Sequence, residues 1–344
     1  MQPIEPAALD AALCAWEDQL AYLHLETTAG AYTAGGFGAF IRNARVRPDR
    51  IQVRGSGPFR LGLAIEGGFV YAEGVTHWET DAQGRLLTAG YDGDGRLSVV
   101  CELSRSPFPV AGTAERRSPV VAALPQVAPP TAERAVLAVL AHPDDETFGC
   151  AGTLALYAGA GIAVTCACAT RGELGRNTGV PSAATRESLP LRRVSELEAA
   201  CGALGIGDLR LLGVWDKTVE FADPEALSAQ IAAILREVGP SLLITHHAEW
   251  GGHPDHCAVG AAALRAVDGL APDRRPRLHV LVPPRAAQGH DIALQTVDVT
   301  PVLEAKLAAV RAHWTQSAAM LRKLAPEELA TRFGRERYLP LSDV

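Results

Sequence analysis

The sequence predicts an α/β protein built from a mostly parallel sheet with helices on both faces, preceded by a smaller β-rich domain. Three observations favour this fold class. The chain has 344 residues, which is more than one average domain needs. Its second half alternates short apolar runs with helical patterns, as parallel sheets with crossover helices do. Its first half instead repeats strand-like segments that are separated by glycine-rich turns.

Residues 1–105 form the predicted β-rich (α+β) accessory domain, which opens with a short helical pattern at Pro6–Leu20. An antiparallel meander follows, with turns at Glu66-Gly67-Gly68 and Asp92–Gly95. The glycine-rich Tyr32–Gly38 lacks the preceding strand and the lysine of a phosphate-binding loop, so we expect a flexible loop there. The predicted strands are Tyr22–Thr28, Arg50–Arg54, Arg60–Glu66, Phe69–Glu79, Arg85–Tyr91 and Leu97–Leu103. Carbohydrate binding, dimerisation and cover of an active site all stay open as roles for this half.

A proline-rich stretch, residues 106–133, separates the two halves of the chain. It shows no convincing periodicity, and its six prolines are Pro107, Pro109, Pro119, Pro125, Pro129 and Pro130. This composition predicts a linker or a strap lying across a surface.

Residues 134–344 form the predicted Rossmann-like domain. The run Ala135–Ala141 is continuously apolar, as expected for a strand that is buried on both faces. Further strands are predicted at Ile162–Ala169, Leu209–Leu212, Ser241–Thr245, Leu278–Val282 and Leu294–Val299. Helices are predicted at about Thr147–Gly159, Thr185–Leu204, Pro224–Val238, Pro254–Val267 and Pro301–Leu324. Ligand sites in such sheets lie beyond the carboxyl ends of the strands.

Composition and charge exclude several classes of partner. The formal net charge is −7 and no long run of lysine or arginine occurs, which argues against nucleic acid and anionic membranes. The N-terminal residues do not resemble a secretory signal, and no apolar run is long enough to span a bilayer. Seven scattered cysteines predict reduced thiols and therefore a cytoplasmic protein.

The first chemically informative motif is Ala141-His142-Pro143-Asp144-Asp145-Glu146, directly after the first buried strand. His142 and Asp145 are three residues apart, so a turn that enters a helix can direct both side chains into one cavity. Imidazole nitrogen and carboxylate oxygen together suit zinc and similar divalent ions. An aspartate at this place can also cap the next helix, which would explain one acidic residue but not the histidine.

The second motif, Gly251-Gly252-His253-Pro254-Asp255-His256, follows another buried strand. Pro254 suits the first position of a helix, and His253 and His256 are again three residues apart. Two such turns, each at the end of a parallel strand, favour one metal site over two unrelated helix caps. A catalytic zinc site typically has three protein ligands and one open position.

With both motifs in place, the second half resembles the PIG-L/LmbE-like de-N-acetylase family, whose members deacetylate N-acetylglucosaminyl substrates in GPI-anchor, mycothiol and bacillithiol pathways. The resemblance runs from about residue 134 to the end of the chain. It rests on AHPDDE at 141–146, TRGELG at 170–175, RRVSELEAACGALG at 192–205, LGVWD at 212–216, GGHPDH at 251–256 and KLAAVRAHWTQS at 306–317. It implies a zinc-dependent hydrolase that releases acetate from an N-acetylglucosamine-type conjugate.

The resemblance also implies roles for individual residues. His142, Asp145 and His256 match the metal ligands, which would hold one zinc or another divalent ion. Asp144 matches the general base that accepts a proton as water attacks the amide carbonyl. Whether His253 or the protonated Asp144 then delivers a proton to the leaving amine stays open.

The remaining matches concern the substrate. His253 matches the histidine that polarises the substrate carbonyl, and Asp255 matches the carboxylate that orients this histidine. Arg193 aligns with a sugar-contacting arginine and Asp216 with an acidic residue at the pocket rim. A tyrosine that some members carry before the second motif is absent, and Trp250 stands in that region.

Three alternatives remain beside the deacetylase. A metal hydrolase of another amide or ester, phosphoesters included, fits the same ligands, although two-metal phosphatases normally show more carboxylates. A nucleotide-binding module is disfavoured because acidic residues follow the first strand of this domain. A non-catalytic metal or sugar-binding module is disfavoured because structural zinc sites use four protein ligands and prefer cysteine. The predicted partner is a small amino-sugar conjugate, and a homo-oligomer stays open.

Overall fold

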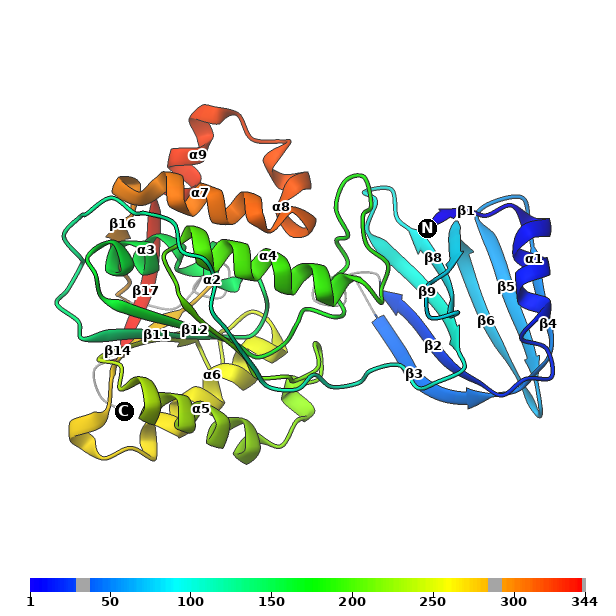
Figure 1. The fold of residues 1–344 in the computed structure, drawn as a ribbon, viewed down its shortest axis with the longest axis horizontal. Helices are drawn as coiled ribbons and strands as arrows, with labels where there is room; N and C mark the ends of the chain where they lie inside the picture. The colour runs from blue at the N-terminus through cyan, green and yellow to red at the C-terminus, as the bar shows by residue number, and fades with distance from the viewer. Residues whose placement is uncertain (29–37, 284–292, 342–344) are drawn as a thin grey trace. The chain divides into compact units, whose positions relative to one another are not determined.

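The computed structural model describes residues 1–28, 38–283 and 293–341. The chain divides into two compact units. Figure 1 colours the chain by residue number, so that the segments of each unit can be followed. Unit 1 comprises residues 1–110 and 175–188, and unit 2 comprises residues 111–174 and 189–344. The boundaries predicted from the sequence at 105 and 134 stay predictions, and they did not anticipate that residues 175–188 group with the first unit. The loop expected at Tyr32–Gly38 lies almost wholly outside the described residues.

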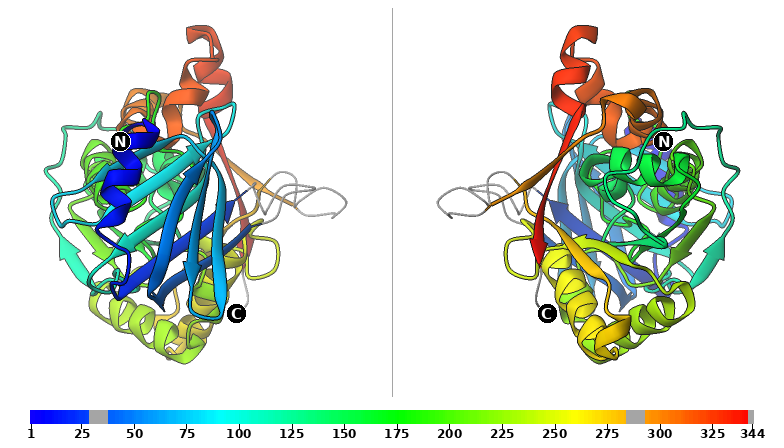
Figure 2. Two further views of the ribbon diagram at one scale, coloured as in Figure 1. Left: turned by 90° about the vertical axis from the view of Figure 1, so that its right-hand side faces the viewer. Right: turned by 90° about the vertical axis from the view of Figure 1, so that its left-hand side faces the viewer.

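Unit 1 contains two antiparallel sheets, of order β1-β7-β8-β9-β2-β3 and β4-β5-β6, and both contribute to one apolar core. Figure 2 shows this unit facing the viewer in its left panel. Helix α1 (Pro6–Cys14) begins after Glu5, whose carboxylate accepts a hydrogen bond from the Ala8 N–H, and α1 packs on β4. The strands are β1 (Gln2–Pro3), β2 (Ala21–Thr28), β3 (Gly38–Val46), β4 (Pro48–Arg54), β5 (Phe59–Ile65), β6 (Gly68–Val75), β7 (His77–Thr80), β8 (Leu86–Tyr91) and β9 (Leu97–Ser104).

The meander differs from its prediction at two places. The single strand expected at Phe69–Glu79 is wrong, because β6 ends at Val75 and β7 continues in the other sheet. Gly74 has φ +87°, a conformation that is strained for other residues, and it lets the chain leave one sheet for the next. Strand β3 was not predicted, since it is an edge strand with no clean alternation of buried and exposed residues.

Unit 2 is built on one large sheet of order β10-β13-β12-β11-β14-β15-β17-β16. Strands β13, β12, β11, β14 and β15 pair in parallel, and the antiparallel β10, β17 and β16 extend the sheet. Its strands are β10 (Glu115–Arg117), β11 (Ala135–Leu140), β12 (Ala163–Cys168), β13 (Asp208–Leu211), β14 (Leu242–His246), β15 (Arg277–Leu281), β16 (Gln295–Asp298) and β17 (Arg335–Leu341).

Helices cover both faces of this sheet, as Figure 1 shows. Helices α3, α4 and α7 share one apolar cluster with one face, and α5 and α6 share another cluster with the opposite face. The helices are α2 (Asp145–Gly149), α3 (Ala151–Gly159), α4 (Leu189–Ala203), α5 (Pro224–Val238), α6 (Pro254–Asp268), α7 (Leu303–Ala312), α8 (Trp314–Leu321) and α9 (Pro326–Phe333). Short 3-10 turns occur at Val219–Phe221, Pro272–Arg274 and Thr300–Val302. The mixed α/β class is thus confirmed.

Two features of the C-terminal region correct the prediction. The long helix expected at Pro301–Leu324 is divided into α7 and α8 at His313. Strand β17 was not foreseen, because its buried Glu336 looks unsuitable for a sheet core when only the sequence is considered. The structure pairs Glu336 with the buried Lys306 ammonium at 2.6 Å, which satisfies the charge.

Strand order creates a crevice in unit 2. β12 and β13 lie on one side of β11, whereas β14 and β15 lie on the other. The connections therefore leave β11 and β14 in opposite directions, and a crevice forms beyond their carboxyl ends. Both histidine motifs of the sequence follow these two strands.

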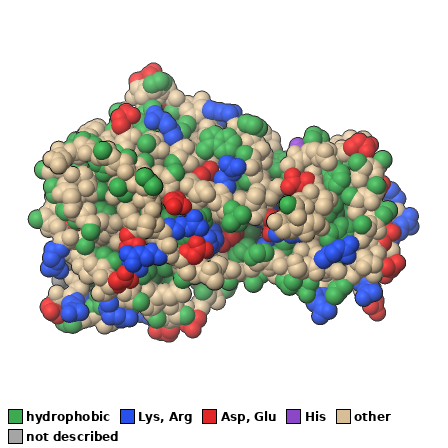
Figure 3. Space-filling model, viewed as in Figure 1, with side chains coloured by type: hydrophobic (Ala, Val, Ile, Leu, Met, Phe, Trp, Pro, Cys, Tyr) green, Lys and Arg blue, Asp and Glu red, His purple; other side chains and the backbone are tan. Residues whose placement is uncertain are grey.

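The bulk surface matches the composition. The face in Figure 3 carries acidic and basic side chains interspersed, with no extended Lys/Arg area. All seven cysteines are free thiols. Within the described residues, no helix combines the length and the hydropathy that crossing a membrane requires.

Candidate active site

The two histidine motifs come together because β11 and β14 are neighbours that pair in parallel. His142 follows β11, and Asp145 is the first residue of the short helix α2. His253 is the N-cap of α6, with Pro254 at the first helical position and His256 in the first turn. The structure therefore brings the residues of the predicted metal site into one place.

The donor groups of three residues face one another at distances that suit a divalent ion. His142 Nδ1 lies 3.1 Å from His256 Nε2 and 3.6 Å from Asp145 Oδ2. His256 Nε2 lies 3.3 Å from Asp145 Oδ1. A tetrahedral ion with bonds of about 2.0–2.2 Å would separate its ligand atoms by about 3.3–3.6 Å. The chemistry and the spacing of this donor set both fit zinc.

Hydrogen bonds from the far side of each ring fix the tautomers that metal binding needs. His142 Nε2 lies 3.3 Å from Asp216 Oδ1 and 3.3 Å from Asp255 Oδ2, so its hydrogen belongs on Nε2. His256 Nδ1 donates to the Gly251 carbonyl at 2.9 Å. Each ring therefore directs its other nitrogen towards Asp145, and this second-side support is usual for metal-ligating histidines.

His246, at the end of β14, is a competing donor that the sequence analysis did not single out. Its Nε2 lies 3.2 Å from Asp145 Oδ2, and its ring stacks on His256 at 4.0 Å. The same nitrogen accepts a hydrogen bond from the Ala141 N–H at 3.2 Å, which occupies its lone pair. This bond favours His142 over His246 as the third ligand.

Asp144 is held in a strained conformation beside the donor set. Its φ of +114° is rare for a residue with a side chain, and such strain concentrates at functional sites. Its backbone N–H donates to Glu146 Oε2 at 3.0 Å, and its Oδ2 lies 3.2 Å from Arg193 Nη2. Burial raises the pKa of Asp144 to about 6, although the Arg193 guanidinium opposes this shift.

Arg193 and Asp216, the predicted substrate residues, are buried and bonded to the protein. Arg193 donates to the carbonyl oxygens of Gly172 and Pro143, in addition to its contact with Asp144. Asp216 accepts from the Leu174 N–H at 2.9 Å and contacts His142. Their contact with a substrate stays a prediction, because their described contacts are to backbone groups and to Asp144 and His142.

His253 lies beside the other two histidines of the site, with its ring 4.9 Å from that of His142. Its Nδ1 accepts the Asp255 N–H at 3.1 Å, which places its hydrogen on Nε2. Burial, together with the neighbouring His142 and His256, lowers the pKa of His253 to about 4, so the ring is neutral at pH 7. The Asp255 carboxylate itself accepts from His142 and from the Lys217 and Val219 N–H groups, so Asp255 bonds to His253 through its backbone.

A buried carboxylate–histidine pair supports the site and was missed by sequence reasoning. Glu146 Oε1 lies 2.6 Å from His313 Nε2, and both side chains are fully buried. Because Glu146 also accepts the Asp144 N–H, this pair connects the break between α7 and α8 to the strained residue. Glu146 ends the AHPDDE motif and His313 lies within the KLAAVRAHWTQS motif, but nothing in the sequence identified the two as partners.

Comparisons with known proteins agree with this geometry. A family model described as GlcNAc-PI de-N-acetylase (PIG-L) matches residues 137–267, which contain every proposed metal ligand. A probable N-acetyl-alpha-D-glucosaminyl L-malate deacetylase 2 of Bacillus subtilis (strain 168) is 43% identical over 213 residues, covering 59% of this chain and 95% of the relative. The chain belongs to the PIG-L family. The resemblance seen in the sequence is thereby confirmed.

Other relatives extend the comparison in two directions. A 1D-myo-inositol 2-acetamido-2-deoxy-alpha-D-glucopyranoside deacetylase of Kineococcus radiotolerans is 31% identical over 250 residues, covering 53% of this chain and 69% of the relative. Residues 3–108 match a different family, described as a protein of unknown function (DUF1806). The uncharacterized protein YojF of Bacillus subtilis (strain 168) is 39% identical over 116 residues, covering 32% of this chain and all of the relative. This chain thus combines a PIG-L domain with a second domain that matches the DUF1806 family.

A cavity of about 680 Å³ opens beside the donors of this PIG-L domain. Asp145, His246 and His256 are among the residues that line it. Three exposed arginines, Arg332, Arg335 and Arg337, line it as well. No carboxylate among the described residues lies within ion-pair distance of any of the three, so their charges are available to an anionic ligand.

Proposed function

We propose that this protein is a metal-dependent N-deacetylase that hydrolyses the acetamide of an N-acetylglucosaminyl conjugate and releases acetate. The observation that carries the proposal is the donor set His142 Nδ1, Asp145 carboxylate and His256 Nε2, with both imidazole tautomers fixed for metal binding. The PIG-L relatives are named as deacetylases of N-acetylglucosaminyl conjugates, which supports the same reaction.

His142, Asp145 and His256 would hold one zinc ion, and other divalent ions suit the same nitrogen and oxygen donors. A bound ion supplies a Lewis acid that polarises the amide carbonyl and lowers the pKa of a water molecule. Asp216 and Asp255 support this set by holding the His142 ring through its Nε2 hydrogen.

Asp144 would act as the general base that takes a proton from the attacking water. Asp144 directly precedes the proposed ligand Asp145, and the Arg193 guanidinium lies 3.2 Å from its carboxylate. A pKa of about 6 leaves Asp144 ionised at neutral pH while making it a better proton acceptor than an ordinary aspartate.

His253 would donate its Nε2 hydrogen to the carbonyl oxygen of the acetamide as negative charge develops there. Because its pKa is lowered to about 4, the ring is neutral and holds no additional proton for the amine. The protonated Asp144 is then the better donor to the leaving nitrogen as the C–N bond breaks. We therefore propose Asp144 as the proton donor to the leaving amine and His253 as the hydrogen-bond donor to the carbonyl oxygen.

The charge of the cavity supports a finer proposal about the substrate. Malate is a dicarboxylate, whereas inositol carries no charge. Three arginines line the cavity beside the donors, and arginine is the residue that binds carboxylates in a two-pronged geometry. We therefore propose that the conjugate carries an anionic aglycone such as malate.

A substrate panel tests the function with the full-length protein loaded with zinc. The panel contains the malate and inositol glycosides of N-acetylglucosamine, the uncharged methyl glycoside and a linear acetamide, with released acetate and amine as the readouts. Asp144→Asn should retain zinc and lose about 100- to 10,000-fold in rate, because an amide cannot accept the proton. If no N-acetylglucosamine conjugate releases acetate while zinc is bound, the proposal is wrong. Turnover of the linear acetamide alone would instead point to a different amidohydrolase.

A further inference from the structure

A fourteen-residue segment, Gly175–Ser188, leaves the PIG-L domain and belongs to unit 1. The residues directly before and after it, Leu174 and Leu189, belong to unit 2. Unit 1 therefore consists of the first 110 residues and this one segment of the domain that carries the proposed active site. We call Gly175–Ser188 the tethered segment.

The end of the tethered segment is held by a buried ion pair. Arg186 Nε lies 2.9 Å from Glu26 Oε2, and Arg186 Nη2 donates to Glu26 Oε1 at 3.0 Å. Both side chains are almost fully buried, on β2 for Glu26 and on the segment for Arg186. Arg186 Nη1 also donates to the Gly175 carbonyl at 2.8 Å, which closes the segment on itself. The hydrogen bond and the short ion-pair distance together hold the Arg186 guanidinium against the Glu26 carboxylate.

The neighbouring Glu187 adds a second anchor. Its carboxylate accepts from Arg42 Nη2 and from Arg85 Nη1, each at 3.0 Å. Arg42 lies on β3, and Arg85 directly precedes β8. Two arginines from separate parts of the first 110 residues thus converge on one carboxylate of the segment.

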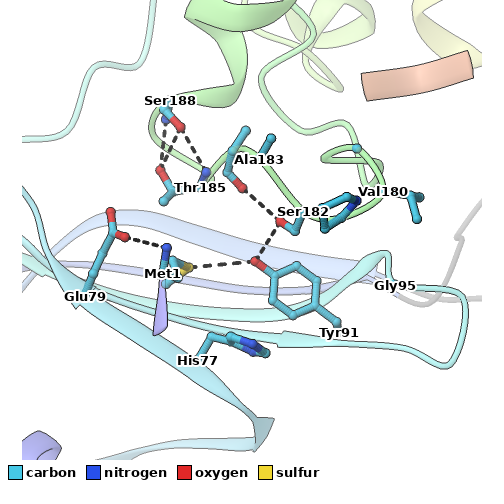
Figure 4. A pocket seen from close by; sticks show the side chains of 13 residues that line it. Met1, His77, Glu79, Tyr91, Gly95, Val180, Ser182, Ala183, Thr185 and Ser188 are labelled. Atoms are coloured by element: carbon cyan, nitrogen blue, oxygen red, sulfur yellow. Dashed lines mark hydrogen bonds and ion pairs between the residues drawn. The ribbon is translucent and has the colours of Figure 1, made fainter. Parts of the chain in front are cut away.

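The beginning and the middle of the segment are held separately. Arg176 donates to Asp92 Oδ2 at 2.8 Å and to the Leu97 carbonyl at 3.2 Å, and its own carbonyl accepts the Leu97 N–H at 2.9 Å. Figure 4 shows Ser182 directed at the Tyr91 hydroxyl, 3.3 Å away, beside a cavity of about 600 Å³. The tethered segment is therefore bonded to residues 1–110 near its beginning, in its middle and near its end.

The two flanks of the segment carry residues of the proposed active site. Leu174, immediately before it, donates its N–H to Asp216, and Glu173 accepts the Asp216 N–H at 3.2 Å. Immediately after it, α4 begins at Leu189 and presents Arg193 to Asp144. Movement of the segment would be transmitted through a few peptide bonds to both contacts.

The comparisons supply an independent observation. The two parts of this chain resemble two separate proteins of the same organism, Bacillus subtilis, each matched over nearly its whole length. Here the two are covalently joined, and the first part holds a piece of the second. Joining two parts in one chain raises their effective concentration and so favours their association. The fusion is therefore consistent with two parts that work together.

We propose that residues 1–110 form a positioning domain for the deacetylase, which fixes the tethered segment and so holds Asp216 and Arg193 in their working places. The proposal rests on the proposed function for its catalytic consequence. Residues 1–110 would then support the reaction without touching the substrate. Arg176, Arg186 and Glu187 are the positioning residues of the segment.

Amide hydrogen exchange and turnover, measured on the full chain, test this proposal. Arg186 is too deeply buried for a clean variant, so the test uses Arg176→Ala, at a partly exposed side chain, and Glu187→Gln, which keeps the shape of the side chain and removes its charge. Exchange at the Leu174 and Asp216 amides should accelerate about 3- to 30-fold in both variants, because local opening becomes easier. The ratio kcat/KM for the active glycoside should fall by a similar factor, with zinc content unchanged. Arg176→Lys, which keeps the charge beside Asp92, should recover part of both losses.

Arg96→Ala is the matched control. Arg96 lies on the same β8–β9 turn and pairs with Asp94 at 3.5 Å, and its described ion pair does not involve the segment. This variant should leave exchange and turnover unchanged. Unchanged exchange at Leu174 and Asp216 in both tether variants would overturn the proposal, and so would faster exchange with full turnover. Hydrogen exchange does not depend on the reaction. If the protein deacetylates no substrate, the proposed function is wrong, but the exchange rates still show whether residues 1–110 hold the tethered segment in place.

Discussion

Arg193 shows how one buried side chain can determine the direction of a catalytic group. Its guanidinium bonds to Gly172, to Pro143 and to the Asp144 carboxylate, so it joins two loops to the proposed base. The resemblance assigned this residue to the sugar. The contacts assign it first to Asp144, whose positive φ would otherwise favour relaxation to another conformation.

Arg193→Ala is therefore expected to lower kcat for the active glycoside and for a minimal acetamide alike, by about 10- to 100-fold, because the base loses its alignment. Arg193→Lys should recover little, since lysine cannot make several fixed bonds at once. The measurement is kcat and KM for both substrates, with zinc content and unfolding temperature as controls. A loss confined to the glycoside would restore the sugar-contact interpretation.

The residues that bind the proposed metal could be predicted from the sequence, whereas their supports could not. His142, Asp145 and His256 stand in two short motifs that follow apolar strands, so spacing alone brings them together. His313 lies 167 residues from Glu146, in a helical pattern that shows no interruption. The stacking of His246 on His256 depends on the register of β14, which local patterns do not determine.

At the scale of the element, β17 illustrates the same limit for the fold. The segment Arg335–Leu341 begins with three charged residues, and one of its buried positions is a glutamate. A strand in this place becomes stable because Glu336 also accepts the backbone N–H groups of Gly152 and Thr153 at the start of α3. Strands with apolar runs, such as β11, could be predicted to within a residue or two, since they need no such distant partner.

The outward side of β17 carries the charges that we connect with substrate choice. Arg335 and Arg337 are two residues apart and therefore project from the same face of the strand. Arg335→Gln and Arg337→Gln together should raise KM for the malate glycoside about tenfold or more, because hydrogen bonds between charged groups are lost. The uncharged methyl glycoside should be affected much less. Equal changes for both substrates would remove the arginines from the specificity argument.

At the scale of the whole molecule, the division into units departs from a simple order along the chain. Local patterns suggested a boundary in the proline-rich stretch, and composition does change there. Residues Gly175–Ser188 group with unit 1 although they lie within the sequence of the second domain. This grouping depends on charged side chains such as Arg186 and Glu187, which look like ordinary solvent-exposed residues in the sequence. Sequence patterns predict which segments are apolar, but they do not reveal which charges become buried together.

The pairing of β11 with β14 also has a consequence for how the molecule resists heat. His142 and His256 are 114 residues apart in the chain, so an ion bound by both acts as a removable cross-link across a very long loop. The free energy by which the bound ion stabilises the fold follows mass action and is about 2.7 kcal/mol when free zinc exceeds its dissociation constant a hundredfold.

Removing zinc with a chelator should then lower the unfolding temperature of unit 2 by about 5–10 °C, and restoring zinc should reverse the change. The unfolding of unit 1, followed by exchange of its own strands, should stay the same, and a chelator-treated protein with an unchanged transition in unit 2 would contradict this cross-link. The ion proposed for catalysis would thus also raise the temperature at which unit 2 unfolds.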